Sequence, residues 1–255
     1  MNKLLIDAGT SWSKVLELYT NPENLEKSPI NKLNRIMGKF YLNTEKNLFT
    51  DKSGNALNGR IFLFPTKLLP KINIFFDSAT GHMVKNHIKP DGSYENEVLA
   101  LAYGAKKILN NPENATIVDL GSRDIKWIKF KDGKYKDLDW NSNCGSATGA
   151  TVEMLCKFYN VDPAKIPVQK EKIPVICGVF AMEKIMDIIA SGVSANIAIA
   201  MYIHGISYNT WHFARQPKEI FLSGGFCMNP CFVESLKLYC KVISLGRFVL
   251  LEGLY

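Results

Sequence analysis

Two short apolar segments of the chain run into the same polar turn and then into a return segment. Residues 4–6 lead into Asp7-Ala8-Gly9-Thr10, and residues 117–118 lead into Asp119-Leu120-Gly121-Ser122. An apolar run, a turn with glycine and a return segment together predict a β-hairpin. A single offset aligns the two hairpins and also pairs Lys14 with Lys126. A repeat at about half the chain length predicts a duplicated domain.

The residues of these turns suit phosphate binding. Glycine allows the backbone to approach a ligand closely, and the next hydroxyl and amide groups can bond phosphate oxygens. The aspartate can organise Mg²⁺ through water. Each copy alone is also compatible with an ordinary hairpin, because Asp and Gly are common turn residues. The duplication favours two turns that bind one triphosphate.

A third element follows in the second half of the chain. Residues 219–223 have a strand pattern that ends in Gly224-Gly225, and Asn229 precedes a predicted helix. A diglycine turn lets a flat base and its ribose approach the backbone. Alone, the same residues describe a simple connection between a strand and a helix. Neither a GxxxxGK[S/T] nor a G-x-G-x-x-G sequence is present, so we expect neither a P-loop nor a dinucleotide site.

Two cysteines precede segments with helical periodicity. Cys144 lies before a pattern at 152–158, and Cys177 lies before another at 185–189. The amides and positive dipole end of a helix N-terminus stabilise a thiolate or an anionic cluster. Two ligands per chain become four in a two-fold dimer, enough for one [4Fe–4S] cluster. The alternative is a pair of buried core thiols. Four further cysteines match no ligand position and are expected to be structural: Cys156, Cys227, Cys231 and Cys240.

Composition favours a globular protein with acidic partners. At 255 residues and 47% apolar composition, the chain can form one large domain or two small ones. Polar residues interrupt the most apolar region, 188–206, and no secretory signal is evident, so we expect a cytoplasmic chain without membrane association. The net charge of +7 favours nucleotides, acyl-CoA thioesters or an acidic protein surface. Scattered basic residues argue against nucleic-acid binding.

The two hairpin turns and the diglycine turn, in this order, resemble the phosphate loops and adenosine loop of the actin, sugar-kinase and Hsp70 superfold. This resemblance implies an α/β fold with a duplicated ribonuclease H-like (actin-like ATPase) unit. The lobes would comprise residues 1–104 and 105–255, with a nucleotide cleft between them and the cluster-ligand helices in the second. The superfold hosts several activities, so it does not assign a reaction.

The cysteine segments narrow the resemblance to one family. Cys144-Gly-Ser-Ala-Thr-Gly149 and Cys177-Gly-Val-Phe-Ala-Met182 are similar to segments of the ATPase activators of 2-hydroxyacyl-CoA dehydratases and the related subunits of benzoyl-CoA reductases. The resemblance implies that both cysteines bind a [4Fe–4S] cluster that bridges a homodimer. It also implies that ATP hydrolysis drives single-electron transfer to a dehydratase or benzoyl-CoA reductase-like partner, with ferredoxin or flavodoxin as electron donor.

The same resemblance assigns roles to single residues. Catalytic roles are implied for Asp7, Asp119 and Glu97, and Glu97 lies in Asn96-Glu97-Val98, which resembles a Thr-Glu-Ile element. Both Glu97 and Lys14 also have an ordinary explanation. Glu97 could be a common helix glutamate, and Lys14 could be a solvated lysine at the end of a strand. ATP or ADP, with Mg²⁺, would be bound by Gly9, Thr10, Ser11, Lys14, Gly121, Ser122, Arg123, Gly224, Gly225 and Asn229.

Two departures from the family leave the hydrolysis rate open. Where the activators usually have Asp-Ile-Gly-Gly-Gln-Asp, this chain has Arg123 in place of glutamine. An arginine there can stabilise phosphoryl charge or simply hold product. The sequence ends at Tyr255 without the Gly-Ala-rich final helix usual in the family, so we expect part of the adenosine side to be remodelled or absent.

Two other functions stay open. A small-molecule kinase of the N-acetylhexosamine type needs a catalytic aspartate, and Asp77 and Asp91 are available, although outside any kinase motif. The other is a nucleotide-responsive binding protein that lacks both catalysis and cluster. Residues 20–60, rich in Asn and Lys, give no functional signal and are expected to decorate the first lobe.

Overall fold

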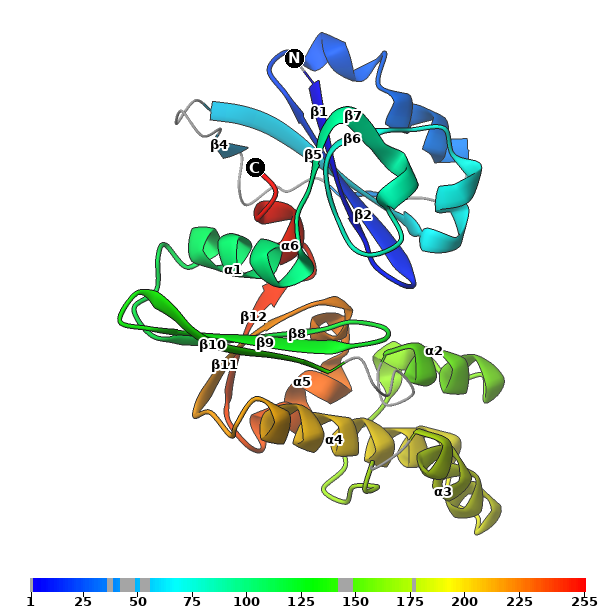
Figure 1. The fold of residues 1–255 in the computed structure, drawn as a ribbon. Coiled ribbons are helices and arrows are strands. Elements are labelled where there is room, and N and C mark those ends of the chain that lie inside the picture. Colours follow the sequence, from blue (N-terminus) through cyan, green and yellow to red (C-terminus); the bar gives the residue numbers. More distant parts are fainter. Residues whose placement is uncertain (1, 36–38, 42–48, 51–55, 142–148, 176–177) are drawn as a thin grey trace. The chain divides into compact units, whose positions relative to one another are not determined.

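The computed structural model describes residues 2–35, 39–41, 49–50, 56–141, 149–175 and 178–255 (Figure 1). Its contacts divide the chain into two units. The first unit comprises Met1–Ile108 and Phe248–Tyr255, and the second comprises Leu109–Arg247. The chain therefore leaves the first unit after Ile108 and returns to it at Phe248.

Within the described residues, the first unit contains a seven-stranded sheet in the order β3-β5-β2-β1-β6-β7, with β4 paired to β5. The pairs β1–β2 and β2–β5 are antiparallel, whereas β6 and β7 continue from β1 in parallel. Ile6, Val15 and Phe62 are fully buried in its core. The strands are β1 (Asn2–Ala8), β2 (Trp12–Tyr19), β3 (Lys39–Tyr41), β4 (Phe49–Thr50), β5 (Ala56–Pro65), β6 (Phe76–Thr80) and β7 (Ile88–Tyr94).

Two α-helices of the first unit pack tightly through glycine. They are α1 (Glu97–Ile108) and α6 (Val249–Glu252). A Cβ atom on Gly104 would lie 1.9 Å from the carbonyl oxygen of Val249, and one on Gly253 would lie 2.0 Å from that of Ala100. No larger side chain fits at either glycine without a backbone shift, so this contact fixes α1 against α6. The 3₁₀ helices of the unit are η1 (Pro22–Leu25), η2 (Pro29–Arg35), η3 (Thr66–Lys71) and η4 (Lys85–His87).

The second unit contains a five-stranded sheet in the order β10-β9-β8-β11-β12. The strands are β8 (Ala115–Leu120), β9 (Ile125–Lys131), β10 (Lys134–Asn141), β11 (Glu219–Ser223) and β12 (Lys241–Gly246). The pairs β8–β9 and β9–β10 are antiparallel, and β11 and β12 continue from β8 in parallel. All six residues of β8 are buried, which agrees with the apolar pattern before the second predicted turn.

Helices of the second unit share one apolar core with this sheet. Tyr202 and Ile203 of α4 are fully buried in the same cluster as Val118 of β8 and Ile185 of α3. No helix in the described ranges has the length and apolar character needed to cross a bilayer. The helices are α2 (Gly149–Phe158), η6 (Pro163–Lys165), α3 (Gly178–Ala190), α4 (Ala195–Phe213), η7 (Gly225–Met228) and α5 (Pro230–Lys237).

Both units repeat one sheet order. The path β5-β2-β1-β6-β7 corresponds to β10-β9-β8-β11-β12, with antiparallel and parallel pairs in the same places. Asp7 lies opposite Lys14 in the first hairpin, and Asp119 lies opposite Lys126 in the second. The predicted α/β fold with a duplicated unit is confirmed.

Candidate functional site

A buried ion pair closes the first hairpin. Lys14 Nζ lies 2.6 Å from Asp7 Oδ2, and the two residues are cross-strand partners at the end of β1 and the start of β2. The Asp7 side chain is 4% exposed. A buried carboxylate needs such a partner, because an unpaired charge in the interior is strongly unfavourable. Lys14, predicted from sequence to be either functional or solvated, is thus tied to Asp7.

The turn that follows is anchored from η3. Thr66 Oγ1 donates to the Gly9 carbonyl at 2.7 Å, and the Thr66 amide donates to the Ser11 carbonyl at 2.9 Å. Thr10, between these two anchors, is exposed. The turn is therefore fixed at both ends and presents the Thr10 hydroxyl to solvent, which suits a group that contacts a phosphate.

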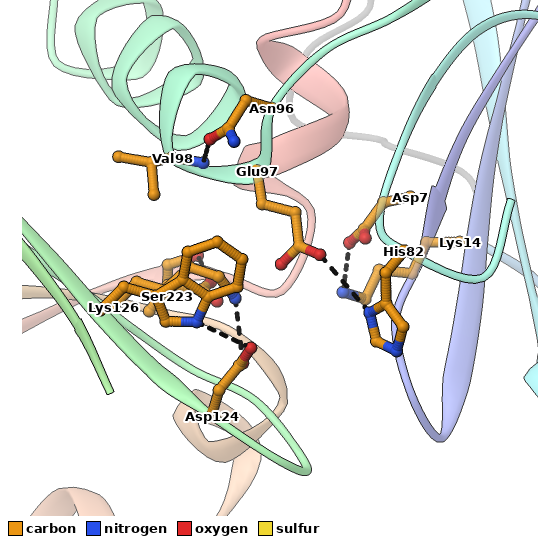
Figure 2. Close-up of polar contacts among 11 residues, drawn as sticks. Asp7, Lys14, His82, Asn96, Glu97, Val98, Asp124, Lys126 and Ser223 are labelled. Atoms are coloured by element: carbon orange, nitrogen blue, oxygen red, sulfur yellow. Dashed lines mark hydrogen bonds and ion pairs between the residues drawn. The ribbon is translucent and has the colours of Figure 1, made fainter. Parts of the chain in front are cut away.

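The second turn is shaped by Asp124. The Gly121 amide donates to the Asp124 carbonyl at 3.0 Å and closes the turn. The Asp124 carboxylate accepts from Lys126 Nζ at 2.9 Å and from Trp140 Nε1 at 3.0 Å, so it has a partner at each oxygen (Figure 2). The Lys126 Nζ atom also lies 5.0 Å from the centre of the Trp140 ring. Arg123, beside Asp124, is exposed.

The hydrogen bonds given for Asp7 and Asp119, the aspartates at the ends of β1 and β8, come from different groups. Asp119 Oδ1 accepts a 2.7 Å hydrogen bond from Ser223 Oγ of β11, while Lys126 bonds Asp124. The residue in register with Asp124 in the first hairpin is Trp12, which has no carboxylate to attract Lys14. The lysine at this position therefore bonds Asp7 in the first unit and Asp124 in the second.

A glycine follows β6 in the first sheet and β11 in the second, and each lies against the end of the neighbouring parallel strand, β1 or β8. Gly81 follows β6 with φ +91°, and Gly224 follows β11 with φ +90°. A Cβ atom on Gly81 would lie 2.3 Å from the Ala8 carbonyl oxygen, and one on Gly224 would lie 2.4 Å from that of Leu120. Only glycine accepts both the left-handed φ and this approach. Sequence reasoning found Gly224 and missed Gly81, although Thr80-Gly81 repeats the hydroxyl-glycine order of Ser223-Gly224.

The diglycine turn leads directly into two short helices. A Cβ atom on Gly225 would meet nothing within 4 Å, so the space above it is open. Asn229 Oδ1 accepts from the Phe232 amide at 2.9 Å and caps α5. The contact of Gly224, Gly225 and Asn229 with a nucleotide stays a prediction, and Asn229 has this structural role in addition.

The N-terminus of α2 is bonded to the second turn. The Gly149 amide donates to the Gly121 carbonyl at 3.3 Å, and the Ala150 amide donates to the Ser122 carbonyl at 2.9 Å. A Cβ atom on Gly149 would lie 3.1 Å from the same Gly121 oxygen. The helix that follows Cys144 in the sequence therefore begins on the turn that is a candidate for phosphate binding.

Glu97 begins α1 and lies near a histidine that sequence reasoning missed. Asn96 Oδ1 accepts from the Val98 amide at 2.9 Å and caps the helix. Glu97 is 8% exposed, and its Oε1 atom lies 3.8 Å from His82 Nδ1. Figure 2 shows the Glu97 carboxylate pointing toward His82 and toward the pair of Lys14 and Asp7. No short motif marks His82 in the sequence, but it directly follows Gly81.

The cysteines divide into described and undescribed residues. Cys144 and Cys177, the predicted cluster ligands, lie outside the described residues. The four expected to be structural are buried, and burial raises the pKa of Cys156 above its usual value and the pKa of Cys231 and Cys240 to about 11. Such thiols stay protonated at neutral pH and are poor metal ligands.

The two aspartates considered as catalytic residues of a kinase are Asp77 and Asp91. Asp77 accepts from the Leu4 amide at 2.7 Å and lies 2.7 Å from Lys89 Nζ, so it supports the sheet. Asp91 is an exposed residue of β7.

No family model matches the chain. It is 25% identical over 187 residues to an activator of lactoyl-CoA dehydratase from Anaerotignum propionicum, a match that covers 68% of this chain and 70% of the relative. It is 23% identical over 171 residues to the (R)-2-hydroxyglutaryl-CoA dehydratase activating ATPase from Acidaminococcus fermentans, covering 63% and 65% of the two chains. The chain is similar to dehydratase activators. The predicted resemblance is therefore confirmed, and the match spans just under two thirds of the second relative.

Solved structures give the same fold. The activator of the 2-hydroxyisocaproyl-CoA dehydratase from Clostridium difficile, solved with bound ADPNP, aligns with a TM-score of 0.68 at 17% identity and covers 100% of this chain and 92% of its own. Component A of the (R)-2-hydroxyglutaryl-CoA dehydratase from Acidaminococcus fermentans aligns with a TM-score of 0.65 at 18% identity, covering 100% and 95%. This chain therefore has a fold similar to that of these two solved structures.

Proposed function

We propose that the chain is an ATP-hydrolysing activator that couples hydrolysis to single-electron transfer toward an acyl-CoA dehydratase or reductase partner. The observation that carries the proposal is the sequence similarity to two dehydratase activators, one of them named as an activating ATPase. The superfold alone is compatible with many reactions, so this similarity is what selects the activator function.

Nucleotide binding is supported by the duplicated turns. Each unit has an aspartate at the end of its first strand and a glycine and hydroxyl in the turn that follows. In this proposal the backbone and hydroxyl groups of Thr10 and Ser122 bind phosphate oxygens. Asp7 and Asp119 hold Mg²⁺ through water, which supplies the charge that offsets the phosphates.

The exposed Arg123 fits a role at the phosphates. Its neighbour Asp124 is held by Lys126 and Trp140, so the backbone of the turn is fixed while the guanidinium is exposed to solvent. An arginine beside a phosphoryl group stabilises negative charge in the transition state. We infer that Arg123 takes the place that a neutral glutamine has in the resembling family.

Cluster ligation rests on the resemblance of the segments that begin at Cys144 and Cys177. α2 begins at Gly149 and α3 begins at Gly178, so both cysteines precede helix N-termini. Burial raises the pKa of Cys156, Cys231 and Cys240, so these three thiols are poor candidates for thiolate ligands. When bound, a [4Fe–4S] cluster supplies one electron at a time.

A homodimer is supported by apolar side chains on the same two helices. Met154 and Phe158 of α2 are 58% and 76% exposed, and Phe180 and Met186 of α3 are 70% and 48% exposed. Large exposed apolar side chains that gather on a surface are typical of interaction sites, and both helices carry such side chains. Two chains would together supply the four thiolates that a cluster requires.

The bonds between α2 and the second turn suggest how hydrolysis and ligation are coupled. Any shift of the Gly121 and Ser122 carbonyls on nucleotide exchange acts on the first amides of α2. That helix follows Cys144 in the sequence, so in this proposal a change at the turn moves the start of the helix that the predicted ligand precedes. Nucleotide drives this change only if it binds the two conformations with different affinity.

ATP hydrolysis by the purified full chain tests the ATPase part of the proposal. Wild-type protein with Mg²⁺ is expected to release phosphate, and Asp7→Asn and Asp119→Asn are each expected to lower kcat by about 100-fold. Asp91→Asn, an exposed aspartate of the same unit as Asp7, is the matched control and should leave kcat unchanged. A wild-type protein that binds ATP without turnover would instead indicate a nucleotide-responsive binding protein.

A further inference from the structure

His82 and Glu97 are brought together by three backbone features of the first unit. The Asp7 and Thr80 residues are partners across the parallel strands β1 and β6. Gly81 then turns the chain against the backbone of Ala8 at the end of β1, and His82 follows it directly. The Glu95 amide donates to the Ala79 carbonyl at 2.8 Å and brings the start of α1 to the end of β6.

A buried hydroxyl at this turn lacks a partner. Thr80 Oγ1 is fully buried and has no hydrogen-bond partner among the described residues. In the second unit the corresponding Ser223 hydroxyl donates to Asp119. Buried polar groups are nearly always hydrogen-bonded, so an unpartnered hydroxyl indicates a polar atom, such as a water, that belongs beside it. The end of β6, just before the turn to His82, thus has a hydroxyl that can bond a further polar atom.

The side chains of Glu97 and His82 differ in solvent exposure. The Glu97 side chain is 11% exposed, and the His82 side chain is 35% exposed. Glu97 also lies at the N-terminus of α1. A buried carboxylate with a half-exposed imidazole beside it can accept a proton from water while the imidazole fixes the carboxylate's direction.

We propose that His82 is a positioning residue for Glu97 in ATP hydrolysis. This inference rests on the proposed ATPase function. The water oxygen forms a bond to the γ-phosphorus, the bond from that phosphorus to the β–γ bridging oxygen breaks, and ADP leaves with that oxygen. Glu97 takes the proton of the water, and the His82 Nδ1–H group bonds Glu97 Oε1 and holds it in place. The 3.8 Å separation is longer than a hydrogen bond and shortens when substrate is bound, as catalytic contacts often do.

The experiment measures kcat and the ATP dissociation constant of the full chain. His82→Phe keeps the ring size but removes both nitrogens, and His82→Asn keeps a donor near the Nδ1 position. We expect His82→Phe to lower kcat by about tenfold with ATP affinity within about twofold of wild type, and His82→Asn to retain most of kcat. His87→Phe is the matched control, because His87 is a half-buried histidine of the same unit that contacts the Ile74 carbonyl.

A double-mutant cycle tests whether His82 acts through Glu97. Glu97→Gln is expected to lower kcat by about 100-fold, and adding His82→Phe to it should cause no further loss. An unchanged kcat in His82→Phe, or the same tenfold loss in the Glu97→Gln background, would overturn the inference. Failure of the proposed function would look different, because the wild-type protein would then show no ATP turnover at all.

Discussion

Asp7 and Asp119 occupy the same position of two copies of one sheet, yet their carboxylates accept from different groups. Asp7 is bonded by Lys14 from the neighbouring strand, at 2.6 Å, whereas Asp119 is bonded by the Ser223 hydroxyl, at 2.7 Å. Lys126, which corresponds to Lys14, bonds Asp124. Each unit thus has a buried lysine–aspartate ion pair at its hairpin, and the second unit adds a hydroxyl bond to its strand aspartate.

Removal of the Lys14 charge should destabilise the first unit. Lys14→Met leaves the Asp7 carboxylate buried without its cation, and breaking a buried pair from one side costs about 3 kcal/mol. Urea unfolding measures the change. Lys165→Met is the control, because the Lys165 side chain is 80% exposed and its pair with Asp162 contributes at most about 1 kcal/mol. Equal stability of the two variants would contradict the importance of the pair.

The two equivalent glycines should not tolerate a methyl group. Gly81→Ala and Gly224→Ala each force a Cβ atom into a neighbouring carbonyl oxygen and also adopt an unfavourable φ. Gly133→Ala is the matched control. Gly133 also has a positive φ, +68°, but a Cβ atom added there would meet no atom within 4 Å. This variant therefore has only the cost of the unfavourable φ, about 1 kcal/mol. The denaturation midpoints of Gly81→Ala and Gly224→Ala should lie well below that of Gly133→Ala. Similar midpoints for all three would show that the close approach is unimportant.

These glycines also show how far the sequence predicts the site. The hairpins, the duplication and the Gly224 turn are all recognisable, because strand periodicity and turn chemistry are local signals. Gly81 was missed since its turn lies after Phe76–Thr80, a strand whose sequence, Phe-Asp-Ser-Ala-Thr, lacks a continuous apolar pattern. His82 and Trp140 were missed because their partners, Glu97 and Asp124, are brought to them by sheet pairing.

The boundary between the two units is also only partly predictable from the sequence. A repeat in the sequence suggests a boundary near its middle, but the packing of α6 on α1 in the first unit depends on close contacts of Gly104 and Gly253. Contacts between segments so far apart have no local signature. Cys144 and Cys177 remain predictions from resemblance.

Loss of the Trp140 indole donor should weaken nucleotide binding. Trp140→Phe removes the 3.0 Å bond to Asp124 and leaves that carboxylate with less support in the second turn. A lost hydrogen bond to a charged group costs about 1.5 kcal/mol, which corresponds to about tenfold weaker ATP binding if the turn is ordered by the nucleotide. Isothermal titration calorimetry measures the dissociation constant of ATP for both proteins.

Trp211→Phe is the matched control for that experiment. Trp211 Nε1 donates to the Pro217 carbonyl at 3.1 Å, a bond of similar length that involves no residue of the second turn. Its loss should affect stability without changing ATP affinity. An unchanged affinity in Trp140→Phe, or an equal change in both variants, would contradict a role of Trp140 in the turn.

Two buried thiols should be unreactive and should make stability depend on alkaline pH. Burial raises the pKa of Cys231 and Cys240 to about 11, so well under 1% of each is thiolate at pH 8. Because the unfolded state ionises first, their contribution to stability is complete below about pH 8.5 and is lost as pH rises toward 11. Iodoacetamide labelling at pH 8, read by mass spectrometry, should modify these cysteines only after unfolding. Rapid labelling of the folded chain would contradict the raised pKa.

The central claim, an ATP-driven electron-transfer activator, is tested most directly by the visible absorption and iron content of protein purified without oxygen. The account predicts brown protein with about four irons per dimer, lost in a Cys144→Ala, Cys177→Ala double variant and retained in a Cys231→Ala, Cys240→Ala control. Colourless, iron-free wild-type protein after anaerobic reconstitution would contradict it.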